Sequence, residues 1–421
     1  MSGLTVDVVR GLDGFQSLRS EWDALFDAVP SASPFLSYAW MAAWQATVGE
    51  GGSPMIICAR DDGRLTGLLA LSERSSATLG KPLRRVSFMG ERVVAADGLD
   101  VLALPQLARP AVGAIIVRLA AEPIDLLVLD GLPPDSFTLQ LLAWQLGSDG
   151  RRAYTLSTDQ ICPYLDLRVG WEGILSTSRR PHQFGKVLRA LSRLDGFEAR
   201  TVTEPGLVGA ALERLLELHD RRWAVQGGSD AMTLPAVREF HRRIGPALAE
   251  RGMVRFEELW VEGACRATYY GFERGDHHWL YQTGYDPGWA KKSVAFIRMS
   301  LSIKEAAERG VTHYDLLRGT ETYKFDWAAA ARVTLRVQAV ARRPAARMLA
   351  SARQLRVATE IAAEAIFPVR SLDILRHWRR SRQRHQNVPP PRPSPAERGR
   401  ETADLPAGRG REIHVAEVIS Q

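Results

Sequence analysis

The stretch VRFEELWVEGACRATYYGFERGDHHWLYQTGY, residues 254–285, decides the fold of this protein. Apolar and aromatic residues dominate the segments 254–261, 265–272 and 277–285, and short polar turns that contain glycine separate them. Apolar runs joined by short glycine turns are typical of β-hairpins. The stretch therefore predicts a three-stranded antiparallel meander.

A helix and a further strand follow the meander. Phe296, Met299 and Ile303 lie on one stripe at helical spacing, which predicts a helix over about 294–309. Residues 313–317 then predict a buried strand. Antiparallel strands that lead into a helix and then into a parallel strand indicate a mixed α/β fold.

The first half of the sequence follows a similar order. It predicts a strand at 4–9, a hairpin at 55–72 and a buried strand at 126–131, with helices between them. No repeat is visible residue by residue, but the order predicts two copies of one α/β fold in tandem. We expect the N-terminal copy in residues 1–160 and the C-terminal copy, which carries the candidate active site, in residues 161–341.

The charge of the chain is distributed unevenly. Its 421 residues carry a net charge of +7, yet the segment from Arg342 onward holds 16 Arg, no Lys and 8 acidic residues. The body before Arg342 is therefore nearly neutral, which argues against nucleic acid as its partner. We expect a basic helical appendage over 342–385 and a disordered tail over 386–421.

The segment 376–384, RHWRRSRQR, is the densest basic run. Such a run can contact an anionic membrane surface or phosphates. The alternative is a solvated helix followed by an unstructured end.

The cysteines and the N-terminus indicate a cytoplasmic protein. Cys58, Cys162 and Cys265 lie far apart and form no CxxC pair, so we expect neither a metal site nor a disulfide framework. The N-terminus lacks the apolar segment of a secretory signal, and no apolar run approaches the ~20 residues that span a bilayer.

Two clusters of polar residues could carry chemistry. Lys291, Lys292 and an N-capping Ser293 stand at the start of the helix after the meander, where free N–H groups attract an anion such as a pyrophosphate. The alternative there is a capped helix with exposed lysines. The second cluster is YDLLRGTETYKFDW, residues 314–327, at the end of a buried strand, where α/β sheets commonly bind ligands. The alternative there is a structural network of ion pairs.

Four segments resemble a known family. They are FLSYAWMAAW at 35–44, LHDRRW at 218–223, YQTGYDP at 281–287 and the stretch 314–327. They are similar to GNAT-type acetyltransferases of the cellulose-biosynthesis (BcsL/CelD-like) family, which are relatives of the FemAB-like tandem acyltransferases. The resemblance covers about residues 1–340. It implies a tandem GNAT-like fold and transfer of an acyl group from acetyl-CoA, with exopolysaccharide production as a frequent context.

Acyl transfer needs a base, an acid for the leaving thiolate and donors for the carbonyl oxygen. Glu321 or Asp315 could serve as the base, and Glu321 is preferred because it lies in a loop beyond the strand end, whereas Asp315 is more typical of a buried structural residue. Tyr281 or Tyr323 could protonate the thiolate. The residues expected to hold the acyl donor are Gln282, Thr283, Gly284, Lys291, Lys292 and Ser293.

Four further residues are candidates for binding the acceptor substrate. Arg318 and Lys324 could hold Glu321 in place or contact an anionic substrate. His219 and Trp223 belong to the LHDRRW segment, although their helical spacing is also typical of a helix–core contact. We expect no metal, because the adjacent His277 and His278 point to opposite faces of a strand.

The sequence therefore predicts an acetyl-CoA-dependent acyltransferase that acts on an amine or hydroxyl of a sugar-related or cell-envelope precursor. Two alternatives stay open. One is FemAB-like transfer from an aminoacyl-tRNA. The other is a non-catalytic GNAT-like scaffold, favoured by one departure: the family usually has Ser-Pro-Gly at the start of the cofactor helix, and this chain has Ser293-Val294-Ala295.

Overall fold

The structure is a computed structural model that describes residues 3–78, 81–148, 150–226 and 232–351. The first half contains β1 (Thr5–Arg10), α1 (Gly11–Ser17), α2 (Arg19–Asp27), η1 (Pro34–Leu36), α3 (Tyr38–Gln45), β2 (Ser53–Asp61), β3 (Arg64–Thr78), β4 (Lys81–Phe88), η2 (Arg92–Val94), β5 (Leu102–Ala103), η3 (Pro105–Leu107), α4 (Ala108–Ala121), β6 (Leu126–Leu132), α5 (Phe137–Ser148) and β7 (Arg152–Asp166). The second half contains η4 (Leu167–Val169), α6 (Gly170–Thr177), α7 (Gln183–Leu191), β8 (Glu198–Val202), α8 (Pro205–Gln226), α9 (Pro235–Ala249), β9 (Val254–Val261), β10 (Ala264–Arg274), β11 (His277–Tyr285), η5 (Pro287–Lys292), α10 (Val294–Glu308), β12 (His313–Asp315), α11 (Thr322–Phe325) and β13 (Ala330–Ala341).

The strands form one sheet whose order shows the two copies directly. The order is β1-β2-β3-β4-β6-β13-β7-β12-β11-β10-β9-β8. Each copy has an antiparallel meander, then a helix, then a short parallel strand: β2-β3-β4, α4 and β6 in the first, and β9-β10-β11, α10 and β12 in the second. The predicted mixed α/β fold with two similar copies is confirmed.

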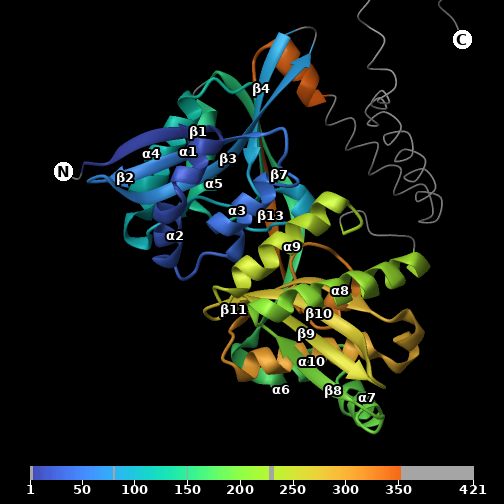
Figure 1. The fold of residues 1–421 in the computed structure, drawn as a ribbon. Coiled ribbons are helices and arrows are strands. Elements are labelled where there is room, and N and C mark those ends of the chain that lie inside the picture. The colour runs from blue at the N-terminus through green and yellow to red at the C-terminus, as the bar shows by residue number, and fades with distance from the viewer. Residues whose placement is uncertain (1–2, 79–80, 149, 227–231, 352–421) are drawn as a thin grey trace, which may run out of the picture. The chain divides into compact units, whose positions relative to one another are not determined.

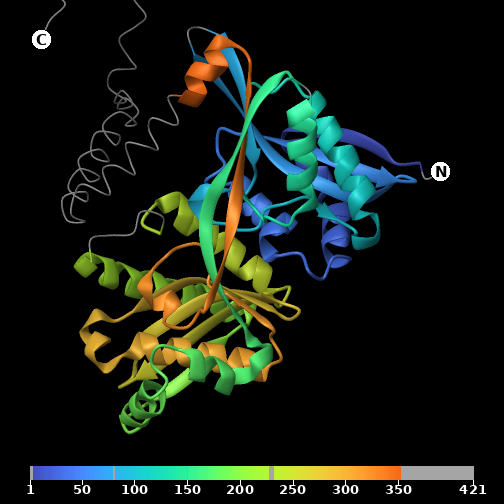
Figure 2. The same cartoon turned by 180° about the vertical axis from the view of Figure 1, so that it is seen from behind.

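The two copies exchange their last strands. β7, which ends the first copy, pairs with β12 of the second, and β13, which ends the second, pairs with β6 of the first. β7 and β13 also pair with each other over most of their length, and Figure 2 shows them side by side between the two halves. No element was predicted from the sequence over 330–341, where the structure has β13, so the exchange was not predicted either.

Aromatic side chains from both copies share one core. The ring of Trp40 on α3 lies 4.8 Å from the ring of Phe240 on α9, and Phe35 lies 5.8 Å from Phe272 on β10. Figure 1 shows α3 and α9 next to each other where the copies meet. The described residues accordingly belong to one compact unit.

One predicted boundary is wrong. The strand expected over 313–317 ends at Asp315, because Leu317 has a left-handed backbone with φ of 54° that cannot continue a strand. Beyond β13, residues 344–351 are helical. Most of the predicted basic appendage, the run 376–384 and the predicted tail lie outside the described residues.

In the part of the chain that the structure describes, no helix combines the length and the apolar character needed to cross a bilayer. The same residues contain no group of three or more His, Cys, Asp or Glu side chains able to hold a metal ion.

Candidate active site

The sheet opens between β11 and β12. The two strands pair in parallel from His277 opposite His313 to Trp279 opposite Asp315, and the recorded pairing stops there. On its other side, β11 shifts its register against β10 between Leu280 and Gln282, so Tyr281 is the extra residue of a β-bulge. A bulge bends its strand and disrupts the ladder locally. The bulge and the end of the pairing together leave an opening beyond Trp279.

Two cavities meet at this opening. One, of about 170 Å³, is lined by Tyr281, Gln282 and the 316–324 loop, including Glu321. The other, of about 270 Å³, lies beside the start of α10 and is lined by Arg180, Arg222 and Ser293 among others. Thr283 and Tyr323 line both cavities. These two residues therefore form the boundary across which a group could pass.

Glu321 and Lys324 form an ion pair at the smaller cavity. The Lys324 ammonium lies 3.1 Å from Glu321 Oε2, and it also donates to the carbonyl oxygens of Arg318 at 2.5 Å and Leu317 at 3.4 Å. Lys324 is buried, whereas 55% of the Glu321 side chain is exposed. Gly319 has φ of +122°, and a Cβ there would lie 2.2 Å from Glu321 Oε2. A side chain at position 319 would therefore displace the Glu321 carboxylate from this position.

The two predicted acids occupy different surroundings. Tyr281 is buried in the aromatic core and its hydroxyl donates to the carbonyl oxygen of Val94. Tyr323 lies at the boundary of the cavities and is hydrogen-bonded to Thr283, whose Oγ1 also accepts from Arg222 at 3.2 Å. Burial raises the pKa of both phenols, so both stay protonated at neutral pH. The Tyr281 hydroxyl therefore donates to a backbone carbonyl, whereas the Tyr323 hydroxyl is hydrogen-bonded to a side chain at the boundary.

Asp315 faces away from this opening. It is buried, accepts the N–H of Leu317 at 2.8 Å and lies 3.6 Å from Arg332 and 3.9 Å from His277. It lines a third cavity, of about 820 Å³, formed by residues of both copies. Leu317 lines both this large cavity and the small one that contains Glu321.

The expected contact of Arg318 with Glu321 is wrong. Arg318 instead binds Asp97 of the first copy, with Nε 2.7 Å from Oδ1 and its backbone N 2.8 Å from Oδ2, and its guanidinium also donates to the carbonyl of Ala96 at 2.7 Å. Lys324 alone pairs with Glu321 among the described residues. Asp97 cannot be predicted as this partner from the sequence, because it precedes Arg318 by 221 positions and no local pattern links the two residues.

The start of α10 differs from the expectation. Ser293 occupies the N-cap position but its side chain makes no capping hydrogen bond, because its φ of 58° is left-handed and not the extended conformation of a capping residue. Lys291 and Lys292 are exposed and neither lines this cavity; the Lys292 ammonium lies 3.8 Å from the ring centre of Trp289. The predicted capping by the Ser293 side chain and the predicted contribution of Lys291 and Lys292 to this cavity are therefore wrong.

Two arginines supply the positive charge that the lysines were expected to provide. Arg180 lines the cavity while paired with Asp326 at 3.2 Å, and Arg222 lines it from α8. The first intrahelical bond of α10 runs from Ile297 N to Ser293 O, so the N–H groups of residues 294–296 precede it. Arg222 lies in the LHDRRW segment, in which His219 and Trp223, and not Arg222, were the predicted binding residues.

Those neighbours do not reach the cavities. His219 is fully buried on α8, and burial lowers its pKa to about 4. A ring without exposed surface cannot contact a substrate, so the substrate-binding role of His219 is wrong. The side chain of Trp223 lies outside the described residues. Gly284 of β11 packs against α8, since a Cβ there would lie 3.1 Å from the carbonyl oxygen of Leu215.

Comparison with known proteins identifies the class of the second copy. Residues 178–325 match the family described as the acetyltransferase (GNAT) domain. This range contains the meander, α10, β12 and the opening between β11 and β12. The chain therefore carries a GNAT-type acetyltransferase domain, although the finer placement in the BcsL/CelD-like family stays a prediction.

One solved structure, of FemX, supports the fold of the larger part of the chain. A crystal structure of FemX is 12% identical and matches 76% of this chain and 95% of its own with a TM-score of 0.54. The C-terminal domain of a putative lysylphosphatidylglycerol synthetase from Agrobacterium fabrum is 10% identical, with 79% and 94% covered and a TM-score of 0.48. A tandem GNAT protein from the clavulanic acid biosynthesis pathway is 12% identical, with 79% and 98% covered and a TM-score of 0.38. No curated protein matches the chain by sequence.

Proposed function

We propose that the protein is an acyltransferase that uses acetyl-CoA to acylate an amine or hydroxyl. The observation that carries the proposal is the meeting of two cavities at Thr283 and Tyr323. One cavity has arginines and a helix start, and the other has the Glu321 carboxylate. This separation suits a reaction in which a donor and an acceptor approach one boundary from two sides.

The residues of the larger of these two cavities fit an acyl-CoA. Arg180, Arg222 and the free N–H groups at the start of α10 can bind the phosphates. The missing Pro-Gly after Ser293 does not remove these backbone donors. When bound, acyl-CoA supplies an activated thioester.

The residues at the boundary can move the protons of such a reaction. Glu321 accepts the proton of the attacking amine or hydroxyl at its Oε atoms, while the Lys324 ammonium keeps the carboxylate in place. The Tyr323 hydroxyl is protonated at neutral pH, as an ordinary phenol is, and is hydrogen-bonded to Thr283 at the boundary. Tyr323 can therefore donate a proton to a leaving group there.

The acceptor approaches from the large cavity. Its volume of about 820 Å³ exceeds that of either cavity at the opening. Leu317 lies between this large cavity and the small cavity that contains Glu321, since it lines both. A cavity of this size accommodates a sugar-sized or larger molecule. The proposal that this molecule is a sugar-related or cell-envelope precursor rests on the sequence resemblance.

Calorimetry with acetyl-CoA tests the donor, and Glu321→Gln tests the base. We expect acetyl-CoA to bind both proteins with affinities within about twofold, because Glu321 lines the other cavity. Thiol release from acetyl-CoA, followed with amino sugars as acceptors, should fall about 10²- to 10⁴-fold in the variant, since a general base contributes that factor.

Glu308→Gln is the matched control. Glu308 is an exposed carboxylate whose partner is Lys304, as Glu321 has Lys324, but it lies at the end of α10 and lines none of the described cavities. We expect it to leave turnover unchanged. A parent protein that does not bind acetyl-CoA would overturn the proposal and favour the tRNA-dependent or scaffold alternative; unchanged turnover in Glu321→Gln would remove Glu321 as the base.

A further inference from the structure

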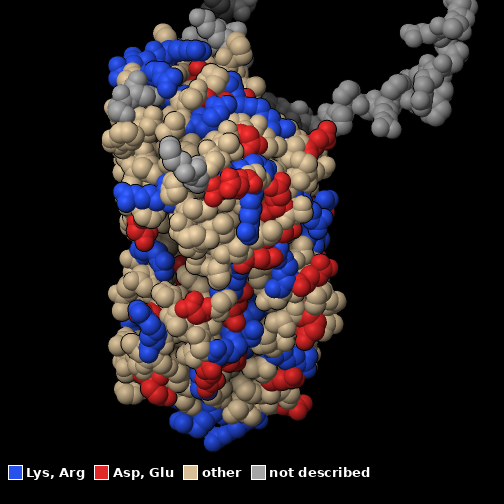
Figure 3. Space-filling view, turned by 90° about the vertical axis from the view of Figure 1, so that its left-hand side faces the viewer, with Lys and Arg blue, Asp and Glu red and all other residues tan. Residues whose placement is uncertain are grey.

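Arginines gather at one end of the first copy. This end, called the arginine end below, comprises the β3–β4 hairpin, the starts of β6 and β7, the end of β13 and the C-terminal ends of α4 and α5. Registers place Arg85 of β4 beside Leu126 of β6, and Leu126 beside Val340 of β13. Figure 3 shows Lys and Arg side chains gathered at its upper end, where Figure 1 draws β4. The arginines of the arginine end are Arg10, Arg74, Arg84, Arg85, Arg118, Arg151, Arg152, Arg342, Arg343 and Arg347.

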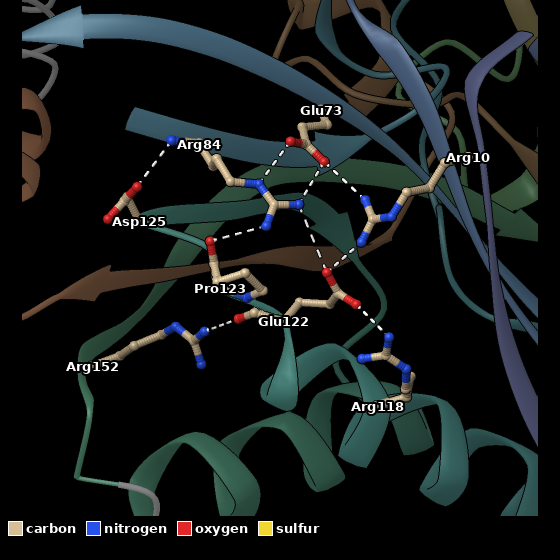
Figure 4. A network of polar contacts seen from close by, with 8 residues as sticks. All are labelled: Arg10, Glu73, Arg84, Arg118, Glu122, Pro123, Asp125 and Arg152. Carbon is tan, nitrogen blue, oxygen red and sulfur yellow. Dashed lines mark hydrogen bonds and ion pairs between the residues drawn. The ribbon is translucent and has the colours of Figure 1, made fainter. Parts of the chain in front are cut away.

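On one face of the hairpin, carboxylates compensate the arginines. Figure 4 shows the Glu122 carboxylate shared by Arg10, Arg84 and Arg118. Glu73 binds Arg84 at 2.7 Å and Arg10 at 3.0 Å. This network is a closed structural feature that fixes the hairpin to β1 and α4.

The opposite face leaves arginines without such partners. Arg74 and Arg85 are directly opposite each other in the β3–β4 register. In the described part of the chain neither has a carboxylate within ion-pair distance, and the buried Nε of Arg85 has no hydrogen-bond acceptor. Like charges directly opposite in a sheet are destabilising. An anion between the two guanidinium groups would remove that repulsion.

The helical residues 344–351 extend this second face. Ala345, Ala346 and Ala350 pack in a cluster that contains Leu83, Leu126 and Val340, the neighbours of Arg85 in the sheet. Arg347 and Met348 are on the exposed side of the helix. The positive face therefore runs from the hairpin onto the helix.

Apolar side chains are also exposed at the arginine end, on the helix 344–351 of the positive face and on α4 and α5 beside the compensated face. Met348 is 48% exposed, Val117 near the end of α4 is 56% exposed, and Trp144, one turn before the end of α5, is 68% exposed. Arginines that attract headgroup phosphates, together with exposed Trp, Val and Met side chains, are the composition of a surface that lies on a bilayer. The arginines could also bind a nucleic acid, but a nucleic acid would provide no apolar environment for Val117 and Met348. The exposed apolar side chains therefore favour a lipid surface.

We propose that the arginine end docks the protein onto an anionic lipid surface. The site lies in the folded body and is distinct from the basic run 376–384. It also does not depend on the acyltransferase proposal, because none of its residues lines the cavities at the β11–β12 opening.

Vesicle co-sedimentation of the full chain tests the proposal. We expect binding to phosphatidylcholine vesicles that contain phosphatidylglycerol and little binding to phosphatidylcholine alone. Arg74→Gln/Arg85→Gln should lower the partition coefficient about 30-fold, since each basic residue contributes about 1 kcal/mol and 1.4 kcal/mol is tenfold. The variant should fold at least as well as the parent, because it relieves the repulsion between the two guanidinium groups.

Arg189→Gln/Arg193→Gln is the matched control. It removes the same charge from exposed arginines on and just after α7, which Figure 1 draws at the far end from β4. We expect a change below about twofold. Trp144→Ala keeps every charge and should weaken vesicle binding several-fold, which provides a second test if the double variant is unstable.

Two results would overturn the proposal. If Arg74→Gln/Arg85→Gln binds the anionic vesicles as tightly as the parent, any membrane contact belongs to another segment of the chain. If the parent binds duplex RNA but not the vesicles, the positive face has a nucleic-acid partner.

Discussion

Leu317 shows how a single residue shapes the candidate site. Its φ of 54° is rare for a bulky side chain and costs of order 1–3 kcal/mol. Asp315 stabilises the conformation by accepting the Leu317 N–H, and Lys324 contacts its carbonyl oxygen. This turn ends β12 early and directs the following residue, Arg318, toward Asp97. Backbone strain is thus concentrated between the small and the large cavity.

His241 should make the stability of the protein depend on pH. It is fully buried among Phe240, Tyr270 and Tyr281, and burial lowers its pKa to about 3. The unfolded chain, with an ordinary histidine pKa near 6.5, binds the proton first as the pH falls. The free energy of unfolding therefore falls below pH 6.5, by up to about 1.4 kcal/mol per pH unit for this group, and is unaffected above it.

His241→Leu isolates this contribution. Urea unfolding between pH 6.5 and pH 4 should show a smaller pH slope in the variant, because one buried imidazole no longer resists protonation. Between pH 7 and pH 8 the two proteins should have the same slope, which serves as the internal control. Equal slopes at the lower pH would contradict the assignment of a neutral, buried His241.

At the scale of elements, α8 depends on a close approach to β11. The backbone of α8 passes Gly284 so closely that a Cβ would lie 3.1 Å from Leu215 O and 3.2 Å from His219 N. This contact sets the distance between the strand with the bulge and the helix that carries Arg222. The expectation that Gly284 helps to hold the acyl donor stays a prediction.

Gly284→Ala should destabilise the protein by about 1–3 kcal/mol, because the methyl group forces α8 away from β11. Denaturant unfolding measures this cost. Gly113→Ala on α4 is the control: a Cβ there meets nothing within 4 Å, so about 0.5–1 kcal/mol of stabilisation is expected. Similar effects at both positions would show that α8 and β11 are not in tight contact.

At the scale of the whole molecule, the two copies are joined by strand exchange and by charged pairs, which include Arg251 with Asp23 and Arg318 with Asp97. Arg318 of the second copy binds Asp97 of the first next to both the small and the large cavity. Burial is the largest influence on the pKa of Asp97 and raises it, with Arg318 acting against this shift. The pair therefore places desolvated charges at the junction of the copies.

Asp97→Ala should cost about 3 kcal/mol in the free energy of unfolding, since it leaves the Arg318 guanidinium without its counter-charge. Asp166→Ala removes the partner of Arg168 from an exposed ion pair and should cost much less, because water screens that pair. Thermal unfolding of the two variants provides the comparison. An equal loss in both would mean that the Asp97–Arg318 pair does not hold the copies together.

Most single elements could be predicted from the sequence. The meander over 254–285, α10 and the β2–β3 hairpin follow from apolar periodicity and glycine turns, which act over a few residues. Contact with Glu321 is one of the two roles that the sequence predicts for Lys324, and the structure has this ion pair. Arg222 belongs to the LHDRRW segment, which carries the family resemblance. The spacing of residues along a helix does not show which side chain faces a cavity, so its place in the cavity lining could not be predicted.

The sequence by itself determined that the chain has two α/β copies, and it predicted the candidate chemistry at the end of a strand over 313–317. Only the tertiary structure decided that β7 and β13 change places, that Asp97 and not Glu321 binds Arg318, and that two arginines lie where lysines were expected. The physical reason is the range of the interactions. Periodicity and turn chemistry are local, whereas strand partners and buried charge pairs are selected by the packing of segments that lie hundreds of residues apart.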